Sequence, residues 1–408
     1  MHKWRHLHRH HLRLNTLLRR AYSTNTTIDS VHVRCGSSGH VTVDLHNFSH
    51  LRHDEPILIH LPPLPTHPGA PSQLPAFLQG LPVASIRYRW DGLVGGRPPA
   101  LLDDDAPPSS PAAPWPAPVH DAAFAYSWLS RTFSPRAQCA RRGVYVYGSF
   151  LGGGLAASLA LTEAHPHARF AVRGFMAYNG IYNWTMFLPD HRVHRPTTSR
   201  AAAGRTIPPP QQLSKGSHLH FLQEQMPGLF GRPAHLFDAF ASPSLLFHAP
   251  GLLVPRSFSA TVAETVALDA LLGKHPDPAY QVQPPRKSHL VFPPRQSTLK
   301  IPAALLLHDA PPVALTASGR PSKRKSSARG RHSFQAQAAE LAELMRRSVD
   351  VVELRERQKW DDDMDGWAGE AERRVQILDV GPGTSDYELS VTGQEAAVGW
   401  LKDRGLGQ

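Results

Sequence analysis

The chain has 408 residues, 41% of them hydrophobic and 19% charged, so it can bury a large core, and wholesale disorder is excluded. Proline accounts for 39 residues and cysteine for only two, Cys35 and Cys139, which argues against long helical bundles and excludes a disulfide-stapled secreted scaffold and a cysteine zinc site. The formal net charge of +11 does not indicate a nucleic-acid-binding surface, because residues 1–28 and 319–332 hold twelve basic and no acidic residues, and the remainder has 32 basic against 33 acidic residues.

Residues 1–22 are predicted to be a mitochondrial presequence that is removed on import, with the matrix as the expected location. The segment is rich in arginine, histidine and leucine, and the first acidic residue of the chain is Asp29. Import requires such an amphipathic, cationic, acid-free helix, and Arg20–Ser23 (RAYS) resembles a matrix-protease site. The segment lacks the apolar run of about seven residues that a secretory signal needs. The alternative is a basic arm that touches RNA.

From residue 40 onwards, the predicted elements alternate between strands and helices. Period-two alternation or a short apolar run predicts a strand, and helical spacing of apolar side chains predicts a helix. The order is typical of a doubly wound, mostly parallel α/β sheet. The longest uncharged stretch, 144–162, contains four glycines, so no membrane span is predicted. The predicted strands are 40–48, 56–60, 83–90, 143–147, 170–179, 299–307, 349–354 and 375–380, and the predicted helices are 74–81, 120–133, 155–164, 334–348 and 395–401.

Two segments interrupt this alternation. Residues 186–295 are rich in proline and histidine and are interpreted as an inserted helical cap, and residues 311–332 are interpreted as a basic, disordered linker. The predicted organisation is therefore a presequence (1–22), the N-terminal part of the core (30–185), the cap (186–295), a core strand (296–310), the linker (311–332) and the C-terminal part of the core (333–408).

No metal site and no cofactor are predicted. The cap histidines lack a carboxylate or cysteine partner at metal-ligand spacing, so we expect them to be solvated. The acidic run 361–365 (DDDMD) lacks the spacing and the distal glutamate of a calcium loop. The aromatic residues of 178–184 either line a ligand pocket under the cap or pack in the core. The cap histidines concerned are His218, His220, His235 and His248.

The turn after strand 143–147 decides the functional interpretation. Gly148-Ser149-Phe150-Leu151-Gly152 joins a strand to a helix of small residues, which is the geometry of a nucleophile elbow. At this turn the chain resembles the α/β-hydrolase superfamily, and residues 237–255 resemble a cap segment of uncharacterised fungal members. The resemblance covers about residues 40–402 and implies a nucleophile between two small residues. That position holds Phe150, which cannot attack a carbonyl, whereas Ser149 lies one residue early.

The oxyanion loop also departs from the pattern that the resemblance implies. The superfamily places backbone N–H donors after an early strand, where they face the developing oxyanion. Here His60 and Leu61 are followed by Pro62 and Pro63, and proline has no N–H to donate. The N–H of Leu151 is the one expected donor that remains.

The third departure concerns the acid and the histidine. The resemblance implies an acid after the strand that follows the cap, where Asp309 lies, and a histidine after the last strand. Residues 380–384 have the right loop character, but the last histidine of the chain is His332. A triad would have to combine Ser149 and Asp309 with His308 or His332, out of the usual chain order.

Together these departures predict a hydrolase fold without hydrolase chemistry. The leading hypothesis is a non-catalytic mitochondrial module that binds a small apolar ligand or a protein. The first alternative is a serine esterase or thioesterase that uses Ser149 on an acyl or ester substrate. The second is a basic adaptor on a mitochondrial RNA–protein assembly, acting through residues 319–332, although nucleic acid is not the expected partner.

Overall fold

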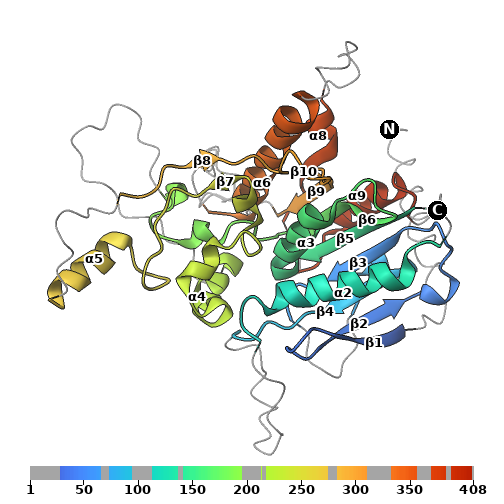
Figure 1. Ribbon diagram of the computed structural model, residues 1–408, viewed down its shortest axis with the longest axis horizontal. Helices are drawn as coiled ribbons and strands as arrows, with labels where there is room; N and C mark the ends of the chain where they lie inside the picture. Colours follow the sequence, from blue (N-terminus) through green and yellow to red (C-terminus); the bar gives the residue numbers. More distant parts are fainter. Residues whose placement is uncertain are drawn as a thin grey trace, which may run out of the picture.

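An eight-stranded sheet forms the centre of the molecule (Figure 1). The computed structural model describes residues 28–65, 73–93, 113–136, 141–194, 213, 217–273, 283–309, 332–355, 369–382 and 387–406. The predicted presequence, the linker up to residue 331 and the acidic run 361–365 therefore lie outside the described residues.

The strand order is β1-β2-β4-β3-β5-β6-β9-β10. The first two strands are antiparallel to their neighbours, and the strands from β4 to β10 are parallel to one another. The central strands are almost fully buried, as their continuous apolar sequences predict. The strands are β1 (Ile28–Arg34), β2 (His40–His46), β3 (Ile57–Leu61), β4 (Val83–Arg87), β5 (Arg142–Ser149), β6 (Phe170–Tyr178), β9 (Ala303–His308) and β10 (Val375–Asp379).

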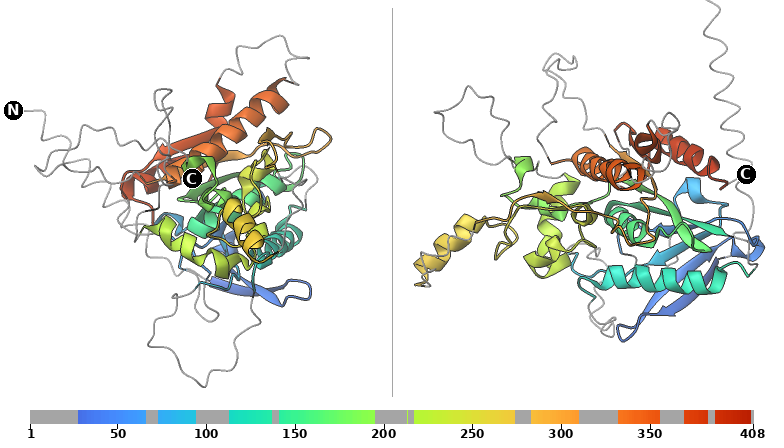
Figure 2. Two further views of the ribbon diagram at one scale, coloured as in Figure 1. Left: turned by 90° about the vertical axis from the view of Figure 1, so that its left-hand side faces the viewer. Right: turned by 45° about the horizontal axis from the view of Figure 1, so that its top comes forward.

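Helices cover both faces of the sheet (Figure 2). One face packs under α2 (Ala117–Phe133), α3 (Phe150–Glu163) and α6 (Phe334–Ser348), and this layer holds the larger apolar core. The opposite face packs under α9 (Val391–Lys402) and the short 3-10 helix Ala76–Leu78. The short helix α8 is Glu370–Arg374 and precedes β10. This is the doubly wound α/β arrangement that the sequence predicts.

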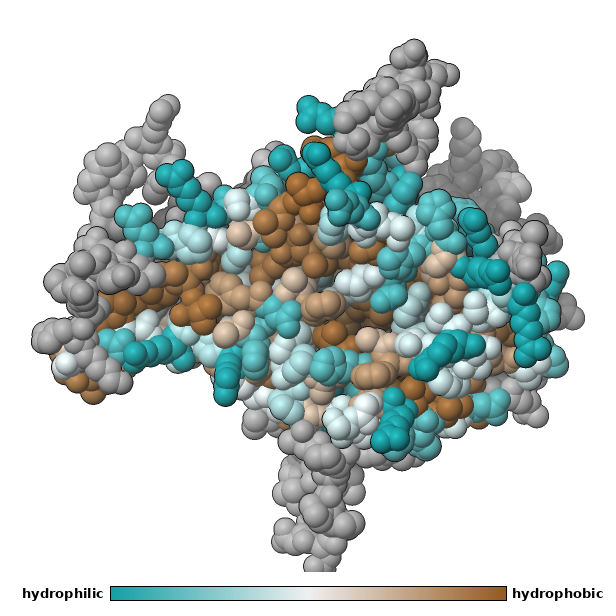
Figure 3. Space-filling view, viewed as in Figure 1, coloured by the Kyte–Doolittle hydropathy of each residue, from teal (hydrophilic) through white to brown (hydrophobic). Residues whose placement is uncertain are grey.

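Between β6 and β9 the chain leaves the sheet and forms the inserted segment. It contains α4 (His218–Phe230), α5 (Val262–Leu271), the two-stranded ribbon of β7 (His248–Ala249) and β8 (Ser288–His289), and several 3-10 turns. Figure 1 and Figure 2 show α5 projecting away from the sheet, and Figure 3 shows apolar surface on this arm. No helix in the described part of the chain has the length and apolarity needed to cross a bilayer.

The structure corrects two expectations about secondary structure. Residues Val349–Leu354, predicted as a strand, form a π-helical turn that continues α6. Val349 and Leu354 are buried in the larger apolar core. The β-branched residues of this run therefore serve core packing and do not form a strand. Strand β1 has no counterpart among the predicted elements. It pairs with β2 along its whole length at the edge of the sheet.

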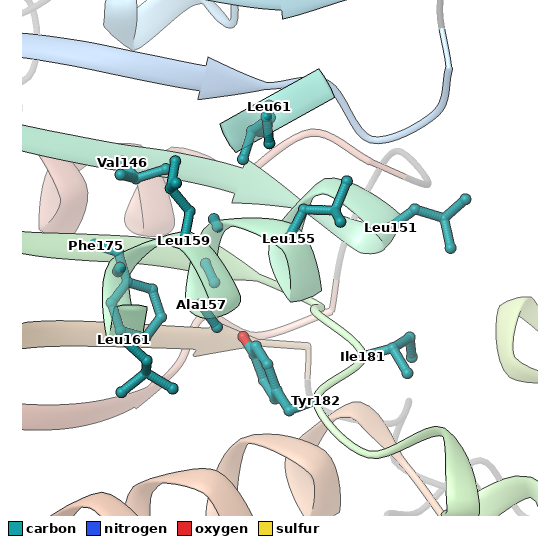
Figure 4. Packing of buried hydrophobic residues seen from close by; sticks show 14 of the residues in the cluster. Leu61, Val146, Leu151, Leu155, Ala157, Leu159, Leu161, Phe175, Ile181 and Tyr182 are labelled. Atoms are coloured by element: carbon teal, nitrogen blue, oxygen red, sulfur yellow. The ribbon is translucent and has the colours of Figure 1, made fainter. Parts of the chain in front are cut away.

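Backbone contacts without side chains fix the position of α3. A Cβ atom on Gly148 would lie 2.2 Å from the carbonyl oxygen of Gly152, and one on Gly152 would lie 2.3 Å from the carbonyl oxygens of Leu61 and Pro62. Figure 4 shows Leu155 of α3 between Leu61 and Ile181. The first turn of α3 therefore packs directly on the chain that follows β3, and only glycine fits this contact.

We predict that Gly152→Ala destabilises the protein by about 3 kcal/mol or more, because its Cβ would overlap two backbone oxygens that cannot rotate away. The matched control is Gly399→Ala in α9, where a Cβ meets nothing within 4 Å. That substitution should stabilise the protein by about 0.5–1 kcal/mol through helix propensity. Urea unfolding measures both values, and equal stabilities for the two variants would contradict the described contact.

Candidate functional site

Phe150 occupies the apex of the turn between β5 and α3. Its φ angle of 53° lies in the left-handed region, and its side chain is only 1% exposed. A bulky residue with positive φ is uncommon and strained, and it persists only where the surroundings enforce it. The turn thus has the strained geometry of a nucleophile elbow, with a hydrocarbon ring at the position of the nucleophile.

Three rings from distant parts of the chain cover Phe150. The ring centroid of Tyr387 lies 5.0 Å away, and those of His218 and Phe334 lie 6.2 Å away. Tyr387 follows β10, in the loop where the family resemblance implies a histidine. His218 begins α4, and Phe334 begins α6. Aromatic pairs at these separations attract one another, so the space above the apex is filled by the protein itself.

The expectation that the N–H of Leu151 remains available for an oxyanion is wrong. This N–H donates to the carbonyl oxygen of Pro63 at 3.2 Å. The neighbouring carbonyl of Pro62 accepts from the Tyr88 hydroxyl at 2.9 Å and lies against Gly152. The loop after β3 therefore directs acceptor oxygens at the elbow, although stabilising an oxyanion requires donors.

Ser149 belongs to β5, and its side chain faces the side of the sheet that α9 covers. It is 2% exposed, and it hydrogen-bonds the phenol of Tyr147 two residues earlier. Alternate strand residues share one face, and Tyr147 lies in the apolar layer under α9 rather than under α3. The serine hydroxyl is thus on the opposite face from the Phe150 ring, as its place one residue before the apex predicts.

Asp309 lies directly after β9, where its carboxylate accepts hydrogen bonds from the Tyr178 hydroxyl at 2.5 Å and from Asn179 Nδ2 at 2.8 Å. Its own N–H donates to Asn179 Oδ1 at 3.0 Å. Burial, and then the bond to Asp309, raise the pKa of Tyr178, so the phenol stays protonated. Within the described ranges, no histidine hydrogen-bonds this carboxylate. Asp309 therefore joins the ends of β6 and β9.

The two histidines considered for a triad are held elsewhere. His308 Nδ1 contacts the Asp309 carbonyl oxygen at 3.2 Å, not its carboxylate. His332 is not part of an exposed linker: it is 7% exposed, its ring lies 4.4 Å from that of Phe187, and Gln337 Nε2 lies 2.8 Å from its Nε2. Burial keeps the pKa of His332 well below its usual value. No described contact connects Ser149 to either ring.

The expected solvation of the cap histidines is wrong for His248. It is 1% exposed, and its Nε2 donates to Glu340 of α6 at 2.9 Å. Burial opposes ionisation of Glu340, but the bond from His248 and the charge of Lys287 hold its pKa below the usual range. This pair joins the ribbon β7–β8 to α6. Among the described residues no group of three histidine, cysteine or carboxylate side chains is placed to hold a metal.

The aromatic residues at and after the end of β6 pack in the core instead of lining a pocket. Tyr178, Tyr182 and Trp184 are each 2% exposed or less. Trp184 lies 4.9 Å from Phe230 of α4, centroid to centroid, so it contributes to the contact between the body and the inserted segment.

No protein-family model and no curated protein sequence matches the chain. Solved structures of esterases do match in fold. A hyperthermophilic esterase from the archaeon Pyrobaculum calidifontis is 12% identical with a TM-score of 0.43, over 96% of this chain and 87% of that one. Carboxyl esterase 2 from the mycorrhizal fungus Tuber melanosporum is 12% identical with a TM-score of 0.46, over 94% and 86%. The strand order and the strand–turn–helix at Phe150 are those of the α/β-hydrolase fold. At these values the likeness carries no information about activity.

The sequence alone does not reveal the rings that cover the elbow at Phe150. Tyr387 could have been found by asking which side chain in the loop after β10 replaces the implied histidine. His218 and Phe334 each stand at the start of an amphipathic helix, and nothing in the local sequence places them over Phe150. Such an arrangement buries an apolar apex, but it presents neither a nucleophile nor an oxyanion donor.

We predict that His60 makes the protein sensitive to acid. This residue of β3 is 1% exposed, it contacts Ser85 Oγ at 3.0 Å, and its Nε2 has no partner among the described residues. Burial, and then His46, lower its pKa to about 3. Because the unfolded chain binds a proton near pH 6.5, stability falls as the pH drops from 6.5 towards 3.

At pH 5.5 this one histidine should lower the unfolding free energy by about 1.4 kcal/mol relative to pH 7.5. His60→Phe should reduce the pH dependence by that amount, whereas exposed His53→Phe should leave it unchanged. Urea unfolding at the two pH values measures the difference. An unaltered pH dependence in His60→Phe would show that His60 is not buried in its neutral form.

Proposed function

We propose that the protein is a non-catalytic member of the α/β-hydrolase fold class that acts as a binding module. The observation that carries the proposal is Phe150 at the strained apex, buried beneath the rings of His218, Phe334 and Tyr387. Acyl transfer needs an atom with a free electron pair at this point, activated by an adjacent base. A phenyl ring supplies neither, and substrate cannot reach it without displacing three side chains.

The state of the oxyanion loop supports the same proposal independently. Removing a single oxyanion donor from a hydrolase lowers kcat by about 10²–10³-fold. Here Pro62 and Pro63 have no N–H, and the N–H of Leu151 is engaged by Pro63. Reversing these changes requires a different backbone between β3 and the elbow, not a rotation of one side chain.

The rings that fill the elbow also bear on where a ligand or partner binds. The rings of Phe150 and its neighbours pack against one another and fill the elbow, so we place the binding surface elsewhere on the fold. A serine esterase that uses Ser149 is the competing function. It would need the hydroxyl to move from the Tyr147 side of the sheet to the side of α3.

We predict that the full-length protein is not labelled on serine by a fluorophosphonate probe and does not hydrolyse p-nitrophenyl acetate above the level of Ser149→Ala. The physical reason is that Ser149 is buried and that no histidine or carboxylate of the described segments hydrogen-bonds it. Mass spectrometry of the labelled protein and initial-rate measurement give the result. Labelling of the folded wild type that disappears in Ser149→Ala would reject the non-catalytic function and favour the esterase.

We further propose that the module works in mitochondria, on the strength of the acid-free basic segment 1–22. Fused to a fluorescent reporter, residues 1–28 should direct it to mitochondria. Replacing five arginines of the segment by glutamine should abolish this targeting, because the membrane potential acts on the positive charge. The arginines are Arg5, Arg9, Arg13, Arg19 and Arg20. Reporter that stays outside mitochondria in both cases would contradict the location.

A further inference from the structure

A cavity of about 400 Å³ lies at the opposite end of the sheet from the elbow, at the amino-terminal ends of β6 and β9. The helix α8 and the residues that follow α9 complete its walls. None of the residues discussed at the elbow lines it, so its function does not depend on whether the elbow is catalytic.

The cavity collects positive charge. Five cationic side chains line it, against the single carboxylate of Glu370. That carboxylate is already paired, with Arg374 at 2.8 Å and Arg373 at 3.3 Å. Arg374 also pairs with Glu353 at 2.6 Å. The close ion pairs described at the cavity therefore involve only the two arginines of α8.

Among the described residues the other three cations form no close ion pair, although the carboxylate of Asp403 lies near enough to Arg404 to oppose the lowering of its pKa by burial. Arg173 donates to the carbonyl oxygens of Pro166 and Ala168, and Arg404 to that of Trp400. Within the described residues, Lys300 makes no side-chain hydrogen bond, and none of the three forms an ion pair within 4 Å. Carbonyl dipoles orient a guanidinium but do not neutralise it.

Two of these guanidiniums are held in place and partly withdrawn from water. The Arg404 guanidinium lies 3.8 Å from the centroid of the Trp400 ring, and Arg173 is anchored by its two carbonyls. Burial lowers the pKa of both, and the nearby charge of Arg141 lowers that of Arg173 further. Burial raises the pKa of the Tyr145 phenol, and the charges of both guanidiniums oppose that rise. Preorganised cations that lack a close ion-pair partner favour binding of an anion.

The walls between the charges are apolar. Val172, Ile301 and Pro302 line the cavity beside Arg173 and Lys300. A volume of about 400 Å³ is within the range of small-molecule sites and is many times the roughly 30 Å³ that one water occupies in the liquid. The cavity is larger than an inorganic phosphate ion, so it has room for an organic body beside a charged group.

We propose that this cavity binds a small phosphorylated organic molecule. Its phosphate lies among Arg173, Lys300 and Arg404, and its organic part packs on Val172 and Ile301. A doubly charged phosphate with three oxygens matches three cationic side chains around one cavity better than a singly charged carboxylate does. This ligand class gives the binding module a site apart from the elbow.

The test measures binding of phenyl phosphate to the full-length protein by isothermal titration calorimetry. We expect saturable binding at one site per chain. Lys300→Met and Arg404→Gln should each weaken it about tenfold, because each removes one charge-assisted contact. Lys402→Met is the matched control, because Lys402 is an exposed lysine of α9 that does not line the cavity. The affinity of this variant for phenyl phosphate should stay within about twofold of the wild-type value.

Several results would overturn the proposal. They are the absence of saturable binding, equal affinity in Lys300→Met and the wild type, and benzoate binding as tightly as phenyl phosphate. If Arg404→Gln fails to fold because it loses the Trp400 contact, Lys300→Met decides the question alone. Binding that appears only after Asp361, Asp362, Asp363 and Asp365 are changed to asparagine would also reject the assignment, because the chain's own carboxylates would then be the occupant.

Discussion

The contact of one backbone with another at the start of α3 determines most of what surrounds it. Gly148 and Gly152 allow the first helical turn to lie directly on the carbonyl oxygens of Leu61 and Pro62. That closeness forces Phe150 into positive φ and brings the N–H of Leu151 onto Pro63. A hydrolase uses the same tight turn to expose a nucleophile. Here it presses an apolar ring into the core.

The electrostatic character of the elbow follows from this contact. With the N–H of Leu151 engaged, the groups that face the apex are carbonyl oxygens and aromatic rings. Developing negative charge would be repelled there rather than stabilised. An excess of positive charge lies instead around Arg173 and Arg404, at the other end of the same strands. The sheet thus separates an apolar, filled end from a cationic, open one.

The sequence predicts much of the fold because strands β3, β5 and β6 are short apolar runs bounded by turn residues, and the two glycines of the elbow have a mechanical reason to be there. It fails where partners are distant. Val349–Leu354 has the composition of a strand, yet the packing of α6 keeps it helical. His248 and His332 are buried by Glu340 and Phe187, and no local pattern shows this. The role of Tyr387 likewise depends on Phe150, more than two hundred residues earlier.

The rings around Phe150 also bear on the order in which the chain folds. They come from positions 150, 218, 334 and 387, so the cluster closes only after the inserted segment and the C-terminal strand have docked. Contacts of such long sequence separation form slowly, since loop closure precedes the gain from packing. A chain that ends before Tyr387 can still form the early strands, but it leaves the strained Phe150 uncovered. Completion of the C-terminus therefore seals the core at the elbow.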